Sequence, residues 1–317
     1  MNNKIVLAAT LWCTVCSASA HLNGHAGIDP TRIPLGDDKV SAGGPRVGYV
    51  YVCGLPRGGG GAHALGPWFN ADGATWDATA KIYVQGHVSW PSSLDLRFAD
   101  GALNISGNGL PDHATGIYPI RPSDPAFQYD RNPNAIGSQT ISWRLPSHPQ
   151  IAAQPGCLGM GAIGIMLSGV RLFNAVDAEG RDAVAHEVQD ACEGHPERRG
   201  NYHYHSVSPC IVRDRPGEHS PLAGYAADGF GIYGNQGENG VPLTNADLDE
   251  CHGHTHLITV NGQRKVEYHY HATREFPYTL GCFKGTPAVT EQRGMPGQRG
   301  RMNFPPPREA LPPLYPQ

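Results

Sequence analysis

Most of the chain alternates between apolar and polar residues in short stretches that glycine, proline and asparagine interrupt. A period of two places successive side chains on opposite faces of a strand, so each stretch predicts a strand. The most apolar run, residues 159–173 (GMGAIGIMLSGVRLF), favours one or two buried strands, although periodicity alone leaves a helix open. The other predicted strands are residues 46–54, 79–90, 94–98 and 138–145, and residues 182–190 (DAVAHEVQD) predict a short helix.

The composition supports a mainly β fold. The 317 residues include 41 Gly and 28 Pro and only 16% charged residues, which is typical of many short strands and turns. The formal net charge of -4 provides no basic surface, so nucleic acid is excluded as a partner. The pattern G-x-S-x-G is absent, which argues against a serine hydrolase.

Both ends of the chain differ from the rest. Residues 1–20 (MNNKIVLAATLWCTVCSASA) have one early Lys, a short apolar run and an A-x-A site, which predicts a secretory signal peptide over a buried helix. Residues 286–317 are rich in Pro, Gly and Arg and predict a disordered tail. Between them we expect a β-rich segment at 21–102 packed on a main domain at 103–285. The predicted location is secreted or periplasmic, without a membrane span.

Cleavage after Ala20 would make His21 the N-terminal residue, with His25 close by. An N-terminal histidine can chelate copper through its amine and ring, as in the histidine brace of copper polysaccharide oxygenases. Nothing else in the chain resembles those enzymes, so we interpret this histidine as a coincidence of the cleavage site.

Two segments of the chain follow one template. Residues 190–210 read DACEGHPERRGNYHYHSVSPC, and residues 249–282 read DECHGHTHLITVNGQRKVEYHYHATREFPYTLGC. Both have D-x-C-x-G-H, a spacer, Y-H-Y-H, a second spacer and Cys, which predicts a duplicated β-hairpin. Six cysteines remain after cleavage, and an even number in an exported chain predicts disulfides. One Cys on each side of each hairpin gives the pairs Cys192–Cys210 and Cys251–Cys282, which leaves Cys53–Cys157.

The second copy allows a prediction of strand register. Asn261–Gly262 between alternating stretches is a strong signal for a type I′ hairpin turn. Such a turn pairs residues whose numbers sum to 523, the sum of 261 and 262. The expected pairs are His254 with His269, His252 with His271, and His256 with Glu267, all with side chains on one face.

So many imidazoles on one patch predict a metal site. Protonated rings would repel one another across the strands, whereas neutral rings can share a cation. Imidazoles without thiolate suit copper or zinc, with nickel or iron less suited, and calcium needs oxygen ligands. The alternative is a polar face or a hydrogen-bonded ladder with the neighbouring tyrosines, which alternate onto the opposite face. The predicted ligands, from both hairpins joined in one site, are His252, His254, His269 and His271, then His203, His205 and His195.

The favoured function is metal storage, delivery or structural binding. A hydrolytic or oxidative metalloenzyme is the second hypothesis, with an acid or base from Asp228, Glu250 or Glu267. Asp228 precedes Gly229 and could equally be a turn residue. The third hypothesis is an interaction module without metal. We interpret His186 and His219 as structural or exposed.

Four motifs in order, NYHYHSVSPC, GYAADGFGIYG, LDECHGHTH and EYHYHATREFPYTLGCFKG, closely resemble the YHYH protein family. The resemblance covers residues 103–285 and departs at Gly231, where family members often have Pro. It implies an exported microbial protein and brings no established activity.

Overall fold

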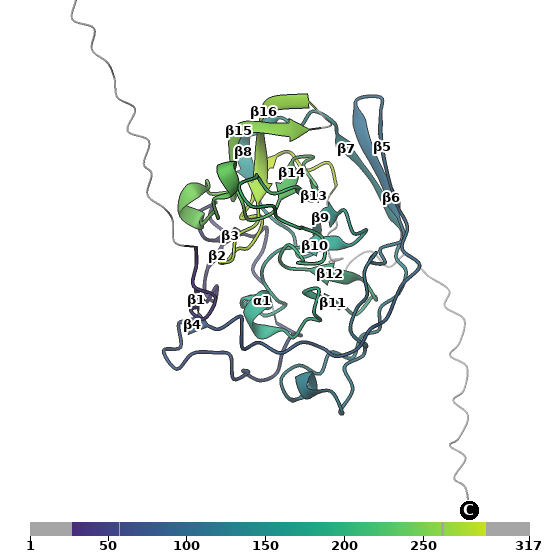
Figure 1. Cartoon of the computed structure of the whole chain (residues 1–317), viewed down its shortest axis with the longest axis vertical. Helices are drawn as coiled ribbons and strands as arrows, with labels where there is room; N and C mark the ends of the chain where they lie inside the picture. The colour runs from purple at the N-terminus through teal and green to yellow at the C-terminus, as the bar shows by residue number, and fades with distance from the viewer. Residues whose placement is uncertain (1–26, 57, 261–262, 290–317) are drawn as a thin grey trace, which may run out of the picture.

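The computed structural model describes residues 27–56, 58–260 and 263–289 (Figure 1). The predicted signal peptide, His21, His25, the Asn261–Gly262 turn and residues 290–317 of the predicted tail lie outside them. The described chain is mainly β, with short strands and one four-residue α-helix, as predicted. No helix in these ranges is long and apolar enough to cross a bilayer.

An eight-stranded sheet, ordered β11-β12-β10-β9-β13-β14-β16-β15, is central to the fold. It consists of two equivalent halves that meet at the antiparallel pair of β9 and β13. In each half the last strand of the YHYH hairpin runs parallel to its inner neighbour, and the other pairs are antiparallel. The duplication therefore includes the two strands before each hairpin. The strands are β9 (Ala162–Met166), β10 (Arg171–Phe173), β11 (Gly194–Pro196), β12 (Tyr202–Tyr204), β13 (Leu222–Ala226), β14 (Gly231–Tyr233), β15 (Gly253–Val260) and β16 (Gln263–His271).

Four smaller sheets surround this one. The largest has the order β5-β6-β7, and the others pair β1 with β4, β2 with β3, and β8 with β17. Their strands are β1 (Ile33–Pro34), β2 (Val40–Ser41), β3 (Val50–Tyr51), β4 (Thr75–Trp76), β5 (Leu94–Ala99), β6 (Ala102–Gly107), β7 (Ile141–Pro146), β8 (Ile151–Gly156) and β17 (Phe283–Gly285). The helical segments are α1 (Ala183–His186) and the 3₁₀ turns η1 (Pro125–Gln128), η2 (Glu238–Gly240) and η3 (Asn245–Asp247).

Most predicted elements are confirmed. Residues 159–173 form β9 and β10, residues 94–98 and 138–145 correspond to β5 and β7, and α1 begins after Asp182, whose carboxylate accepts the Ala185 N–H. The strand predicted at 79–90 is wrong: Val84 and Val88 make only isolated bridges, and Gly86 between them has a φ of 123°. Of the predicted strand at 46–54, only β3 forms.

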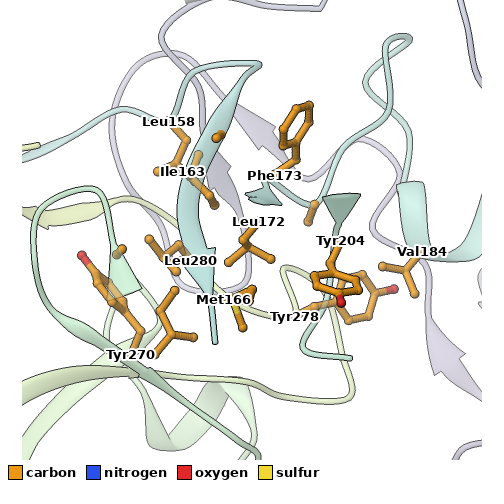
Figure 2. Packing of buried hydrophobic residues seen from close by; sticks show 14 of the residues in the cluster. Leu158, Ile163, Met166, Leu172, Phe173, Val184, Tyr204, Tyr270, Tyr278 and Leu280 are labelled. Carbon is orange, nitrogen blue, oxygen red and sulfur yellow. The ribbon is translucent and has the colours of Figure 1, made fainter. Parts of the chain in front are cut away.

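The core lies against the tyrosine face of the YHYH strands. Tyr204 and Tyr270 are fully buried, and they pack among aliphatic side chains from several elements (Figure 2). Because side chains alternate along a strand, burying the tyrosines directs the intervening histidines to the other face. The packing of the core thus decides where the histidines point.

All three predicted disulfides are present: Cys53–Cys157, Cys192–Cys210 and Cys251–Cys282. The Cys53–Cys157 bond joins the N-terminal segment to the segment between β8 and β9. Hydrogen bonds do the same: Trp68 Nε1 donates to the carbonyl of Ala185, and the N–H of Gly36 donates to Asp182. The β5–β6 hairpin spans the expected boundary at residue 102.

Candidate metal centres

The second hairpin has the predicted register. His254 pairs with His269 and His256 with Glu267, and the ladder continues to the pair of Val260 and Gln263. His252 differs from the prediction, because β15 begins at Gly253 and His252 has a φ of 72°. Its Nδ1 lies 2.8 Å from the carbonyl oxygen of His271, and its Nε2 contacts the hydroxyl of a neighbouring threonine. The ring of His252 therefore turns away from the other histidines.

The remaining histidines form a group that we call the outer cluster. In it, Nε2 of His219 lies 3.4 Å from Nε2 of His269 and 3.1 Å from that of His271, and the latter two atoms are 3.1 Å apart. His219 comes from the segment before β13 and was not predicted to take part. The outer cluster comprises His219, His256, His269 and His271, which each offer a ligand atom within 4.8 Å of the others, together with the adjacent His254.

Backbone carbonyls fix the tautomer of the three central rings. Nδ1 of His219 lies 2.8 Å from the carbonyl oxygen of Ser220, Nδ1 of His269 lies 3.0 Å from that of Glu267, and Nδ1 of His271 lies 2.7 Å from that of Gly234. A carbonyl only accepts, so each Nδ1 carries the hydrogen, and a neutral ring then has a lone pair on Nε2. Three lone pairs consequently face one another at 3.1–3.4 Å.

Burial keeps these rings neutral. It lowers the pKa of His269 from 6.5 to about 3 and that of His254 to about 4, and it holds the pKa of His271 well below the usual value. The pKa of His219 is lowered for the same reason. Protonation therefore does not relieve the repulsion among the lone pairs at neutral pH, whereas a bound cation would.

The outer cluster borders a groove on the surface. His269 and Tyr233 contribute to its wall, and their rings are 5.0 Å apart. Leu103 and Pro146 of the β5–β6–β7 sheet and Glu267 of β16 also line the groove. His219, His254 and His256 are only partly buried, so a ligand can approach this cluster from solvent.

A second group, which we call the inner cluster, lies on the first hairpin. His195 pairs with His203 across β11 and β12, and Nε2 of His203 lies 3.2 Å from Nε2 of His205. Oε2 of Glu187, just after α1, lies 3.4 Å from Nε2 of His195 and 3.4 Å from Nε2 of His205. The inner cluster comprises Glu187, His195, His203 and His205, all buried.

The two clusters share one design but are separate. His205 Nδ1 bonds the carbonyl of Asn174 at the end of β10, and His271 Nδ1 bonds that of Gly234 at the end of β14. Five strand spacings separate β12 from β16, which is about 24 Å, and Figure 1 shows the hairpins at opposite ends of the sheet. The histidines predicted to form one joint site are thus divided between two clusters, one on each hairpin.

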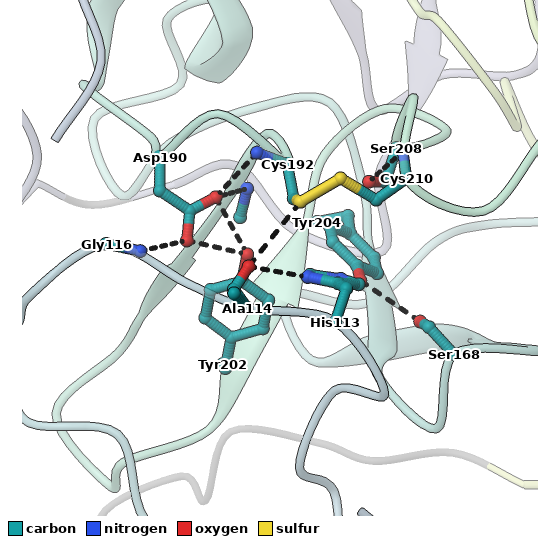
Figure 3. Close-up of a disulfide and its surroundings, with 11 residues drawn as sticks. His113, Ala114, Gly116, Ser168, Asp190, Cys192, Tyr202, Tyr204, Ser208 and Cys210 are labelled. Atoms are coloured by element: carbon teal, nitrogen blue, oxygen red, sulfur yellow. Dashed lines mark hydrogen bonds between the residues drawn. A yellow bond between two sulfur atoms is a disulfide. The ribbon is translucent and has the colours of Figure 1, made fainter. Parts of the chain in front are cut away.

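The tyrosines brace both hairpins from the opposite face. Tyr202 donates to Asp190, which also accepts the N–H groups of Gly116 and Cys192 (Figure 3). Tyr268 donates to Asp249 in the same way. Accepting this hydrogen bond is the role of the Asp that begins each copy of the D-x-C-x-G-H template.

The three carboxylates predicted as candidate acids or bases form hydrogen bonds or ion pairs with other residues. Asp228 is buried and accepts from the hydroxyl of Tyr270 at 2.5 Å and the N–H of Gly285 at 2.9 Å, so its carboxylate is part of the bracing network. Glu250 forms an ion pair with Lys284. Glu267 forms one with Lys265 at 2.7 Å at the edge of the groove.

A third group of candidate ligands contains His113, Cys192 and Cys210. Its two sulfurs are bonded to each other, and Nε2 of His113 contacts the hydroxyl of Tyr204 (Figure 3). Neither thiolate is available, so this group is structural.

Two members of the clusters could not be predicted from the motifs. His219 lies 50 residues before His269 and belongs to no repeat or periodic stretch. Glu187 lies three residues before the Asp of the first template copy, where the second copy has no matching Glu. Only the tertiary structure brings either residue to its cluster.

Comparisons with known proteins gave one match. No curated protein and no solved structure matches the chain significantly. The model of the YHYH protein family matches residues 142–242, a narrower range than the expected 103–285 that contains the first hairpin and ends before the second. Over residues 142–242 the chain is thus similar to the YHYH protein family, the family that its motifs indicated.

Proposed function

We propose that the protein is an exported metal-binding protein whose outer cluster holds copper or zinc. The observation that supports this most is the convergence of three Nε2 atoms, from His219, His269 and His271, at 3.1–3.4 Å while each Nδ1 is directed at a carbonyl. Neutral lone pairs at this spacing repel unless a cation lies between them. Three disulfides support the exported location, because such bonds persist in oxidising compartments.

The spacing also bears on which metal fits. Imidazole nitrogens at about 2.0–2.1 Å from a tetrahedral ion are about 3.3 Å apart, whereas neighbours in a square plane are about 2.9 Å apart. Two separations in the outer cluster, at 3.1 Å, lie midway between these values, and the third, at 3.4 Å, matches the tetrahedral one, so the set favours zinc. His254 and His256, whose Nε2 atoms are buried and have no hydrogen-bond partner among the described residues, are candidates for the fourth position.

A metalloenzyme that uses the outer cluster is the second candidate function. It is supported by the groove beside His269, which a substrate could enter, and by the partly exposed rings of His219 and His256. A catalytic metal keeps one position for water or substrate, and the outer cluster is the more accessible of the two.

The test is a metal titration of the purified mature protein with zinc and with copper. His269→Ala combined with His271→Ala should weaken binding at the outer cluster by at least about 100-fold, since two of the three converging nitrogens are lost. His87→Ala combined with His148→Ala is the matched control, because both side chains are exposed and distant in sequence. Equal affinity in the two double variants would refute the proposal.

A further inference from the structure

The inner cluster contains a type of donor that the outer cluster lacks. We propose that Glu187, His195, His203 and His205 form a second, independent metal site that binds a divalent ion of the zinc class through three imidazoles and a carboxylate. The proposal uses none of the outer residues. An experiment can therefore refute this proposal without refuting the proposed function, and the reverse.

Ligand atoms of His195, His203 and His205 all lie within 4.8 Å of one another, and the carboxylate of Glu187 lies beside two of these rings. Nε2 of His203 and of His205 are 3.2 Å apart, and Oε2 of Glu187 is 3.4 Å from Nε2 of both His195 and His205. Nδ1 of His203 lies 3.1 Å from the carbonyl oxygen of Asn201, and Nδ1 of His205 contacts that of Asn174. These carbonyls hold the hydrogens on Nδ1, so each Nε2 has a lone pair, and that of His205 lies beside the carboxylate oxygen.

In the part of the chain that the structure describes, hydrogen bonding leaves three polar atoms of Glu187 and His195 without a partner. Oε2 of Glu187 and both ring nitrogens of His195 are buried without a hydrogen-bond partner among the described residues. Buried polar atoms are almost always paired, so such a concentration at one point calls for a ligand. A proton on Glu187 would satisfy one imidazole nitrogen, whereas a cation satisfies the carboxylate and the converging nitrogens together.

The nearby cations do not replace a metal. The ammonium group of Lys81 donates to the carbonyl of Val184 and to Gln189, and Arg181 pairs with Asp177. Both remain close enough to act on Glu187 through their charge, as do the carboxylates of nearby aspartates. Among the residues that the structure describes, none of these groups forms a hydrogen bond or ion pair with Oε2 of Glu187.

The surroundings make the inner site a closed one. Phe173 stacks on the ring of His203 with the centroids 4.0 Å apart, and the three histidines are 3–4% exposed. Three imidazoles and one carboxylate form a mixed nitrogen and oxygen set that suits Zn(II) and similar divalent ions better than Cu(I). Four protein donors without solvent access are typical of a structural metal rather than a catalytic one.

The experiment counts zinc ions per chain in the mature protein by elemental analysis, after loading with zinc and dialysis. Glu187→Gln should lose one equivalent relative to the unmodified protein while retaining the ion at the outer cluster. His269→Ala combined with His271→Ala should show the opposite loss. Glu193→Gln is the matched control, since Glu193 is a nearby carboxylate that accepts from Ser206, and it should bind as many ions as the unmodified protein.

A second variant keeps the test decisive if the Glu187→Gln protein misfolds. If circular dichroism shows that Glu187→Gln does not fold, His203→Gln replaces it, with the same expected loss of one equivalent. The unmodified protein could bind a single zinc ion. If Glu187→Gln loses that ion while His269→Ala combined with His271→Ala retains it, the result would support the inner site and refute the outer one. Folded Glu187→Gln or His203→Gln protein with undiminished zinc would overturn the inner site and leave only a carboxyl–imidazole hydrogen bond.

Discussion

Tyr270→Phe tests whether the tyrosines brace the hairpins as the structure indicates. The hydroxyl of Tyr270 donates to Asp228 at 2.5 Å and accepts the N–H of Lys284 at 2.7 Å, and both Tyr270 and Asp228 are buried. A hydrogen bond to a charged group contributes about 1.5–3 kcal/mol, and an unpaired buried N–H costs about 1–3 kcal/mol. We therefore expect the free energy of unfolding to fall by about 3–5 kcal/mol.

The duplicated half supplies the control. Tyr204 has the equivalent position in the first hairpin, where its hydroxyl contacts Ser168, at 3.0 Å, and His113 in place of a carboxylate. Neutral hydrogen bonds contribute about 1 kcal/mol each, so Tyr204→Phe should cost about 2 kcal/mol less than Tyr270→Phe. Urea unfolding of the metal-free proteins, with disulfides intact, measures both changes as shifts of the midpoint. A loss below about 1 kcal/mol for Tyr270→Phe, or equal losses for the two variants, would refute the assignment of the buried carboxylate as the main partner.

Three further predictions concern pH, disulfides and the N-terminal segment. Burial lowers the pKa of His252 from 6.5 to about 4. The neutral ring therefore stabilises the metal-free fold above pH 6.5, and this contribution, about 3 kcal/mol, is lost as the pH falls toward 4. In His252→Gln the urea midpoint should change less between pH 6.5 and pH 4 than in the unmodified protein. Replacing Cys192 and Cys210 by Ser should lower the free energy of unfolding by about 3 kcal/mol, because their bond closes a loop with a sequence separation of 18; an unchanged urea midpoint would contradict this. Asp182→Ala should cost about 3 kcal/mol or more in the same assay, since the carboxylate accepts from Gly36, Ala185 and Tyr278, and a loss under 1 kcal/mol would contradict this role.

Local patterns predicted the second hairpin well. The Asn-Gly turn and the period of two fix which residues of β15 and β16 face each other, so the pairs of His254 with His269 and His256 with Glu267 followed from the sequence. Two disulfides followed from the repeat, because each encloses a hairpin, and the third joins the two cysteines that remained. The N–H of His271 does donate to the carbonyl of His252, but the side chain of His252 leaves the shared face because its positive φ ends the alternation.

Long-range contacts could not be predicted in the same way. The two hairpins are separate because the strands before them, β9 and β13, pair at the centre of the sheet, and no local signal specifies that pairing. His219 and Glu187 reach their clusters from segments without a repeated motif. Residues 79–90 alternate like a strand but lie beside loops that offer them only isolated bridges. Contacts between segments far apart in the sequence therefore determine the strand pairing and the cluster members that the local pattern does not specify.

The most direct test of the outer metal site is an anomalous difference map from crystals of the zinc-loaded protein, recorded on both sides of the zinc absorption edge. We expect a peak about 2.0–2.1 Å from Nε2 of His219, His269 and His271, with each Nδ1 still directed at its carbonyl oxygen. Crystals soaked at saturating zinc that show no peak among these three nitrogens would contradict it.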